Sequence, residues 1–207
     1  GTCASTPAPP RRYPWGVMSK HIAGLKVGDT LDFKGPMPKL PYAANEFDAV
    51  GMVERRVYVR RHTPHPPTPP QVAGGTGLTP LLQVLEKALA DPADATTFAL
   101  LFGNVTPDDI LLKGRLDALA AAHPGRFAVE YYVDAPPSWW RGGRGYVDKK
   151  AIARFLPAAT QKTKILVCGP PGLVKMVAGA KVSFKDQGPV GGHLAALGFS
   201  RDQVYKF

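Results

Sequence analysis

The sequence is poor in cysteine and contains no long hydrophobic run. Its 207 residues include two cysteines, Cys3 and Cys168, which are too few for the disulfide framework of a small secreted protein. No apolar stretch approaches the roughly 18 residues that a membrane-spanning helix needs, and the N-terminus does not resemble a secretory signal. We therefore expect a soluble globular chain in a reducing compartment, with any membrane anchor lying upstream. Residue 1 is Gly rather than Met, which indicates a fragment or a processed product.

Acidic residues are also scarce, at 16 against 26 lysines and arginines, and the formal net charge is +10. Such a charge would suit nucleic acid, but the basic residues are scattered and no known nucleic-acid-binding module is present. A basic surface equally suits an acidic protein partner, because complementary charge speeds the encounter. We expect a protein partner, no nucleic acid and no metal site.

The second half of the chain alternates short apolar strands with helices. A glycine-rich turn precedes an apolar helix in which leucines recur at helical spacing. The Asp108-Asp109 pair lies at the expected positive N-terminal end of the next helix. This alternation predicts a parallel sheet that helices cover on both faces. The strands are expected at Phe98–Phe102, Phe127–Val133 and Ile165–Cys168, and the helices over Leu81, Leu82, Leu85 and Leu89, over Ile110–Ala122, over Lys149–Leu156 and from Leu173 to Ala178.

The first part of the chain is less regular. Residues 1–12 are small, Pro-rich and basic, which is typical of disorder. Met18–Leu25 is expected to form a short helix with Ile22 and Leu25 facing inward. Lys26–Asp29 reads as a turn, and the alternation of Thr30–Phe33 predicts a strand.

Two segments carry candidate chemistry. Gly74–Pro80 (GGTGLTP) lies between a strand and a helix, where glycines let the backbone approach a phosphate and the helix supplies N–H donors. No Lys-Ser/Thr pair follows its last glycine, so a dinucleotide is favoured over a nucleoside triphosphate, although packing alone also explains such turns. Cys168–Gly172 (CGPPG) ends a strand, where ligands of open α/β sheets bind. It is either a buried cysteine before a tight turn or a thiol beside a cofactor.

Five motifs occur in an order that points to one family. GGTGLTP, FGNVTPDDILL, YYVDAPPSWW, CGPPG and the C-terminal VYKF resemble the NADH–cytochrome b5 reductases, which belong to the ferredoxin–NADP reductase group. Three further segments resemble the fungal mitochondrial branch: GPMPKLPYAANEFD, DDILLKGRLDALA and KVSFKDQG with LGFSRDQVYKF. The likeness runs from Tyr13 to Phe207 with one interruption.

The resemblance implies a fold and an activity. The fold would be a doubly wound α/β domain that binds NADH on a parallel sheet, preceded by the C-terminal part of an antiparallel FAD-binding β-barrel. The activity would be transfer of electrons from NADH through FAD to cytochrome b5 or a similar haem protein. The location would be the mitochondrial outer membrane or the intermembrane space. The alternative is a non-catalytic nucleotide-binding fragment of such a reductase without bound FAD.

The resemblance also implies roles for individual residues. Asp134 would bind the ribose diol and favour NADH over NADPH, because a carboxylate repels a 2′-phosphate. Thr79 and Cys168 would lie at the hydride-transfer step. Phe207 would lie on the flavin-facing side or simply fill an apolar groove. The other implied contacts are Gly74, Gly75, Thr76 and Gly77 at the NADH pyrophosphate; Thr79 and Pro80 near the nicotinamide and flavin; Gly103 and Asn104 at the adenosine; Cys168, Gly169, Pro170 and Pro171 at the nicotinamide; and Gly16, Met18 and Ser19 at the FAD pyrophosphate.

The chain departs from the family pattern in two ways. The first flavin motif of the family, Arg-x-Tyr-Ser/Thr, is absent, so FAD is expected to bind weakly or not at all. Residues 53–71 (VERRVYVRRHTPHPPTPPQ) interrupt a strand, which a Pro-rich segment contradicts. The expected organisation is therefore disorder over 1–12, partial FAD barrel over 13–52, insertion over 53–71 and NADH-binding domain over 72–207.

The insertion has two interpretations. It is either a polyproline loop that binds a partner or a translated intron. Val53-Glu54 can be encoded by GTGAG and Gln71 by CAG, which are usual intron ends, and joining Met52 to Val72 restores the uninterrupted strand. We predict a spliced transcript that joins these two residues. Mature transcripts that all retain the segment would contradict the prediction.

Overall fold

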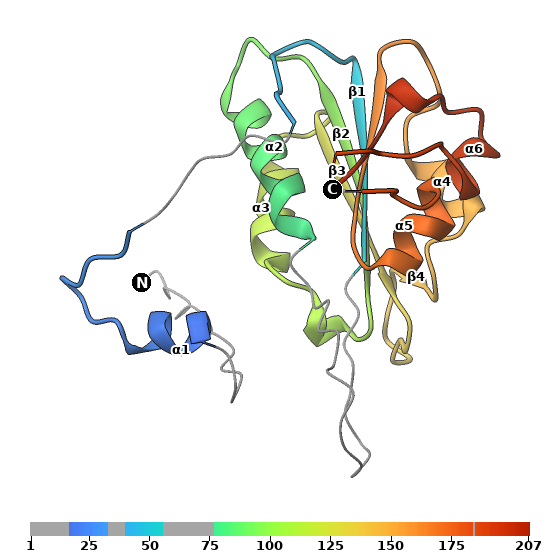
Figure 1. Ribbon diagram of the computed structural model, residues 1–207. Helices are drawn as coiled ribbons and strands as arrows, with labels where there is room; N and C mark the ends of the chain where they lie inside the picture. Colours follow the sequence, from blue (N-terminus) through green and yellow to red (C-terminus); the bar gives the residue numbers. More distant parts are fainter. Residues whose placement is uncertain (1–16, 33–39, 56–76, 184) are drawn as a thin grey trace. The chain divides into compact units, whose positions relative to one another are not determined.

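The computed structural model describes residues 17–32, 40–55, 77–183 and 185–207, which fall into two units (Figure 1). The smaller unit spans residues 1–41 and the larger one residues 42–207. The disorder expected over residues 1–12 and most of the insertion lie outside the described residues.

The smaller unit contains one described helix. Helix α1 (Val17–Gly24) agrees with the expected Met18–Leu25 to within one residue at each end, but Ile22 is 45% exposed rather than turned inward. The expected turn is present, because the Lys26 amide donates to the Asp29 carboxylate at 2.7 Å. Residues 30–32 have no regular structure, so their predicted strand is wrong in its described part. Alternation alone does not make a strand without a neighbour to pair with.

The larger unit is built on a six-stranded parallel sheet with the order β4-β3-β2-β1-β5-β6. Short apolar strands form its centre, and the two shortest strands lie at its edges. Its strands are β1 (Ala49–Arg55), β2 (Thr97–Asn104), β3 (Phe127–Val133), β4 (Gly143–Arg144), β5 (Thr163–Cys168) and β6 (Val204–Lys206).

Helices cover both faces of this sheet, so the predicted doubly wound α/β fold is confirmed. Figure 1 shows α2 (Leu78–Ala90) and α3 (Lys113–Ala122) on one face. The other face carries α4 (Lys149–Phe155), α5 (Pro171–Ala178) and α6 (Gly192–Ala195). The two 3₁₀ turns are η1 (Pro107–Asp109) and η2 (Arg201–Gln203).

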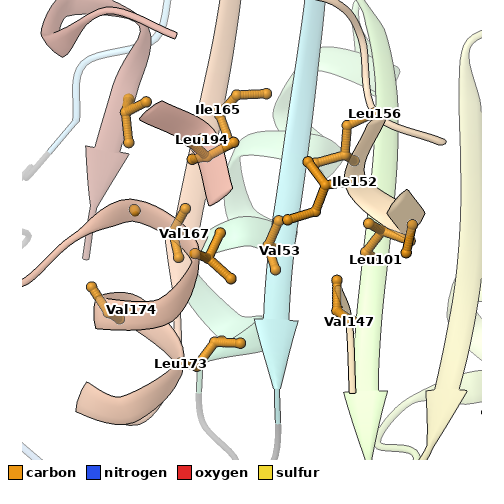
Figure 2. Close-up of a cluster of buried hydrophobic side chains, with 14 of the residues drawn as sticks. Val53, Leu101, Val147, Ile152, Leu156, Ile165, Val167, Leu173, Val174 and Leu194 are labelled. Atoms are coloured by element: carbon orange, nitrogen blue, oxygen red, sulfur yellow. The ribbon is translucent and has the colours of Figure 1, made fainter. Parts of the chain in front are cut away.

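Buried aliphatic side chains fill the space between the sheet and helices α4 to α6 (Figure 2). Val53 of β1 lies between Leu101 of β2 and Val167 of β5, and all three are fully buried. Ile152 of α4 and Val177 of α5 close this layer from the helical side. Burying one such side chain stabilises the fold by about 1.5–3 kcal/mol, so the central strands hold the edge of the sheet rigid.

Helix α3 begins later than the sequence predicts. It starts at Lys113 rather than Ile110, because Leu112 adopts a left-handed conformation with φ 53°. The two aspartates precede it in η1, where the Asp109 carboxylate accepts hydrogen bonds from the Thr106 hydroxyl at 2.7 Å and amide at 3.1 Å. The acidic pair therefore belongs to the 3₁₀ turn and not to the first turn of α3.

The boundary between the two units also differs from the expected one. The sequence places residues 13–52 in the FAD barrel and begins an insertion at Val53. In the structure the larger unit begins at Tyr42, and Val53, Glu54 and Arg55 are the last residues of β1. Val53 fits the buried end of β1 because it has the same side chain as Val72, the residue that would follow Met52 without the insertion.

A buried hydrogen-bond network fixes the chain where it enters β1. The Tyr42 hydroxyl donates to the Asp94 carboxylate at 2.5 Å, and the Thr96 and Asn45 amides donate to the same group. Burial acts to raise the pKa of Asp94, but these hydrogen bonds outweigh it and lower that pKa below its usual value. Burial and the bond to Asp94 raise the pKa of Tyr42 to about 12.

We predict that Asp94→Ala lowers the free energy of unfolding by about 1–3 kcal/mol at pH 7, because it leaves buried donors unpaired. Tyr42→Phe should cost about 1 kcal/mol, since it removes one bond. A lowered folded-state pKa contributes stability above the unfolded pKa that is lost as the pH falls through the folded value. The free energy of unfolding, measured with urea, should therefore fall less between pH 6 and pH 2 in Asp94→Asn than in the wild type. Identical acid losses would contradict the role of Asp94.

Candidate nucleotide site

The parallel strands bring their C-terminal ends to one edge of the sheet, here called the carboxyl edge. Ligands of open α/β sheets bind at this edge, where the strand order reverses. The reversal lies between β1 and β5, because β1 leads to β2 on one side while β5 and β6 lie on the other. The predicted site residues that end or follow these strands are Gly103, Asn104, Asp134, Cys168, Gly169 and Phe207.

Gly77 lies at this reversal and precedes α2. A Cβ atom there would come within 3.0 Å of Glu54 Oε1 and 3.3 Å of the Cys168 carbonyl carbon, so the turn has no room for a side chain. Thr79 is exposed and Pro80 half-buried in the first turn of α2, where the missing proline N–H costs nothing. The expected phosphate contacts Gly74, Gly75 and Thr76 lie outside the described residues.

The end of β5 forms the other side of the reversal. Gly169 has a φ of +151°, and a Cβ there would meet the Leu173 side chain at 2.7 Å. Pro170 precedes α5 and Pro171 begins it, so this turn is short and stiff. Gly77 and Gly169 thus let these two turns pack closely beside Cys168, and both glycines remain partly exposed.

Cys168 is half-buried and lies opposite Glu54 in the β1–β5 register. Burial, followed by the negative charge of Glu54, raises the pKa of the Cys168 thiol to about 11. The group is therefore a neutral thiol at physiological pH. Because the thiolate and not the thiol is the nucleophile, Cys168 would pack beside a ligand without attacking it. The structure shows Cys168 partly buried at the end of β5, before the Gly169-Pro170 turn, and its place beside a cofactor stays a prediction.

The end of β2 lies next to the end of β1. Gly103 is buried there, and its missing side chain leaves room for the stem of Arg55 from β1. Asn104 is fully buried, and its side-chain Nδ2 donates to the Phe102 carbonyl at 3.2 Å. Its backbone carbonyl accepts from the Asp134 amide at 3.0 Å. Asn104 therefore holds the start of the Asp134 loop in place.

Asp134 follows β3, and its side chain is 22% exposed. Its carboxylate forms an ion pair with Arg55, whose guanidinium carbon lies 3.5 Å from the centre of the Tyr146 ring. Sequence reasoning missed Arg55, because it assigned that residue to the insertion, and it gave no role to Tyr146. Arg55 and Asp134 are 79 positions apart, so only the sheet topology reveals their contact.

Phe207 and the three residues predicted at the FAD pyrophosphate are the remaining predicted site residues. The Phe207 amide donates to the Val167 carbonyl at 2.9 Å, and its ring meets that of Tyr205 edge to face at 4.9 Å, so Phe207 lies beside β5. Met18 is 63% exposed in α1 of the smaller unit, which also contains Ser19, and Gly16 lies outside the described residues. Among the described residues, those proposed for NADH that end or follow β2, β3 and β5 therefore lie along the carboxyl edge, and the roles of all the predicted residues stay predictions.

The donor set and shape of the carboxyl edge fit a nicotinamide dinucleotide. Gly77 and Gly169 are partly exposed beside Cys168, and the partly exposed Asp134 follows β3 on the adenosine side, so an extended ligand would run from the glycine turns to a carboxylate.

Comparison with known proteins agrees with this geometry. Residues 72–179 match the family described as Oxidoreductase NAD-binding domain. The chain belongs to this family. Residues 11–42 match the Oxidoreductase FAD-binding domain, which covers most of the smaller unit.

Similar proteins carry the name that the motifs predicted. NADH-cytochrome b5 reductase 2 of Botryotinia fuckeliana is 42% identical over 95% of this chain, and that of Coccidioides immitis is 44% identical over 95%. The chain covers 52% and 55% of these two relatives, so it spans about half their length. The predicted resemblance to NADH–cytochrome b5 reductases is confirmed.

Solved structures show the same fold. The cytochrome b5 reductase domain of Ulva prolifera nitrate reductase is 29% identical, with a TM-score of 0.70 over 93% of this chain and 66% of that one. The CS-b5R domains of human Ncb5or, in their NAD+ form, are 22% identical, with a TM-score of 0.61 over 94% of this chain and 46% of that one. Among the described residues, none of the helices has the length and apolar character to cross a membrane.

We predict that the Cys168 thiol reacts slowly with iodoacetamide at pH 7.5, and that its rate rises with a midpoint near the pKa of about 11. Cys3→Ser is the background for the measurement, so that one thiol remains. Glu54→Gln should move the midpoint to lower pH, because removing a negative charge favours the thiolate. A midpoint at the usual cysteine value of about 8.5, or one that Glu54→Gln leaves in place, would contradict this account.

Proposed function

We propose that this chain is the NADH-binding part of a flavoprotein reductase that passes electrons from NADH through FAD to cytochrome b5 or a similar haem protein. The observation that carries the proposal is the glycine-lined reversal between β1 and β5, where Gly77 and Gly169 flank Cys168. Membership of the NAD-binding family and the printed names of the relatives support it.

The residues of this chain bind and orient rather than react. The N-terminus of α2 and the bare backbone at Gly77 would hold the pyrophosphate, and the Gly169-Pro170-Pro171 turn would limit how the nicotinamide tilts. Cys168, as a neutral thiol, would pack beside the ring and keep water away, and Thr79 would line the same place. When bound, NADH and FAD would supply the redox chemistry, a hydride transfer followed by single-electron transfer to the haem acceptor.

The acceptor and the location are further parts of the proposal. The net charge of +10 favours an acidic protein partner, and the relatives' names point to cytochrome b5. A mitochondrial outer-membrane or intermembrane-space location stays a prediction from the resemblance.

A second candidate function is nucleotide binding without turnover. Of the three residues predicted at the FAD pyrophosphate, Gly16 lies outside the described residues and Met18 is 63% exposed. We predict that the purified chain retains little FAD through gel filtration, and that NADH-dependent ferricyanide reduction stays near background without added FAD. A stoichiometric flavin spectrum would instead favour the active reductase.

The nucleotide site itself is tested by Gly77→Ala. The new Cβ would lie 3.0 Å from Glu54 Oε1, 3.1 Å from its Cγ and 3.3 Å from the Cys168 carbonyl carbon, so Glu54 or the turn that would hold the pyrophosphate must give by a few tenths of an ångström. We expect the Kd for NADH, measured by calorimetry, to rise at least about tenfold, a change of 1.4 kcal/mol. Gly114→Ala in α3 is the matched control, because its Cβ meets nothing within 4 Å. Equal NADH affinity in both variants would contradict the placement of the site.

A further inference from the structure

Arg55 crosses the part of the carboxyl edge that the adenosine of a dinucleotide would use. It ends β1 opposite Gly103 of β2, and a Cβ at Gly103 would lie 3.1 Å from the Arg55 Cγ. The absence of a side chain at Gly103 therefore lets the Arg55 stem pass over β2. Its guanidinium then reaches the Asp134 carboxylate after β3, and the whole residue is only 7% exposed.

Tyr146 completes this arrangement. The Gly145 amide donates to the Val133 carbonyl at 2.8 Å, which places Tyr146 beside the Asp134 loop. The Tyr146 residue is 62% exposed, yet one face of its ring is covered by Arg55 at 3.5 Å. A carboxylate and an aromatic face are the groups that recognise a ribose and a base. Arg55 contacts both of them.

The charge of this site differs from that of a lone carboxylate. An unpaired Asp134 would repel the 2′-phosphate that distinguishes NADPH from NADH, but Arg55 cancels its charge. The Arg55 Nε is buried and, among the residues that the structure describes, has no hydrogen-bond partner, so a charged donor is left without an acceptor. A phosphate oxygen would satisfy such a donor.

The surroundings of Tyr146 add positive charge. Tyr146 lines a cavity of about 410 Å³ that also holds four cationic side chains and two carboxylates. The cations outnumber the carboxylates, so the potential next to the Arg55–Asp134 pair favours an additional phosphate. These residues are Arg141, Arg144, Lys150 and Arg154, with Glu130 and Asp148.

We propose that Arg55 determines which nucleotide this site accepts, because it neutralises Asp134 and supplies a donor for a 2′-phosphate. The chain then takes NADPH as well as NADH, where Asp134 alone would select NADH. This inference rests on the proposed nucleotide-binding function and deepens it.

The test measures Kd for NADH and for NADPH by calorimetry on the full chain. The wild type should bind the two nucleotides with similar affinity. Arg55→Met keeps the apolar stem and removes the charge, so it should raise the NADPH-to-NADH ratio of Kd values at least about tenfold. Adding Asp134→Asn to Arg55→Met should return the ratio to near one, because no charge is left to discriminate. Arg55→Lys keeps the charge and should stay close to the wild type.

Arg201→Met is the matched control, because Arg201 also forms an ion pair, with Asp186 at 3.4 Å, but lies before β6 rather than at its carboxyl end. It should leave the ratio unchanged, and thermal unfolding should confirm that every variant is folded. An unchanged ratio in folded Arg55→Met, or equal tightening of both nucleotides, would overturn the inference and leave the proposed function standing. Failure of the wild type and Arg55→Met to bind either nucleotide would overturn both.

Discussion

The structure of the larger unit depends on the pairing of β1 with both β2 and β5. This pairing puts the reversal of strand order next to β1, so the C-terminal ends of β1 and β5 lie side by side at the carboxyl edge. It also sets the register that places Glu54 opposite Cys168 and Arg55 opposite Gly103. The Val53 side chain anchors that register in the core. A one-residue slip would turn each of these side chains to the other face of the sheet.

The end of β1 also determines the charge of the nucleotide site. Glu54 brings a carboxylate next to the thiol of Cys168, and Arg55 brings a guanidinium onto Asp134. Both residues belong to the segment that the sequence separates as an insertion. Joining Met52 directly to Val72 would replace Val53, Glu54 and Arg55 by Val72, Ala73 and Gly74, which keeps the buried valine and removes both charges. Splicing of this segment would therefore leave the fold in place and change what the site binds.

Regular periodicity made the core of the fold predictable. The leucines of α2 and the apolar runs of β2, β3 and β5 lie where the sequence places them, because burial on one face or both leaves a clear pattern. The short strands β4 and β6 have too few residues for such a pattern. The late start of α3 depends on the left-handed Leu112, and the Arg55–Asp134–Tyr146 contacts join distant segments. The proposed roles of site residues came from the family motifs, because spacing alone did not decide whether the glycine turn and Cys168 bind a ligand or only pack.

The central claim is that a nicotinamide dinucleotide lies along the carboxyl edge, from the reversal at Gly77 to Asp134. A crystal structure of this chain grown with NADH tests it most directly. The account predicts density for the pyrophosphate at the N-terminus of α2 and for the adenosine ribose beside Asp134, with the Arg55 side chain displaced from the ring of Tyr146. Nucleotide bound at the opposite edge of the sheet, or only within the cavity that Arg141 and Arg154 line, would contradict it.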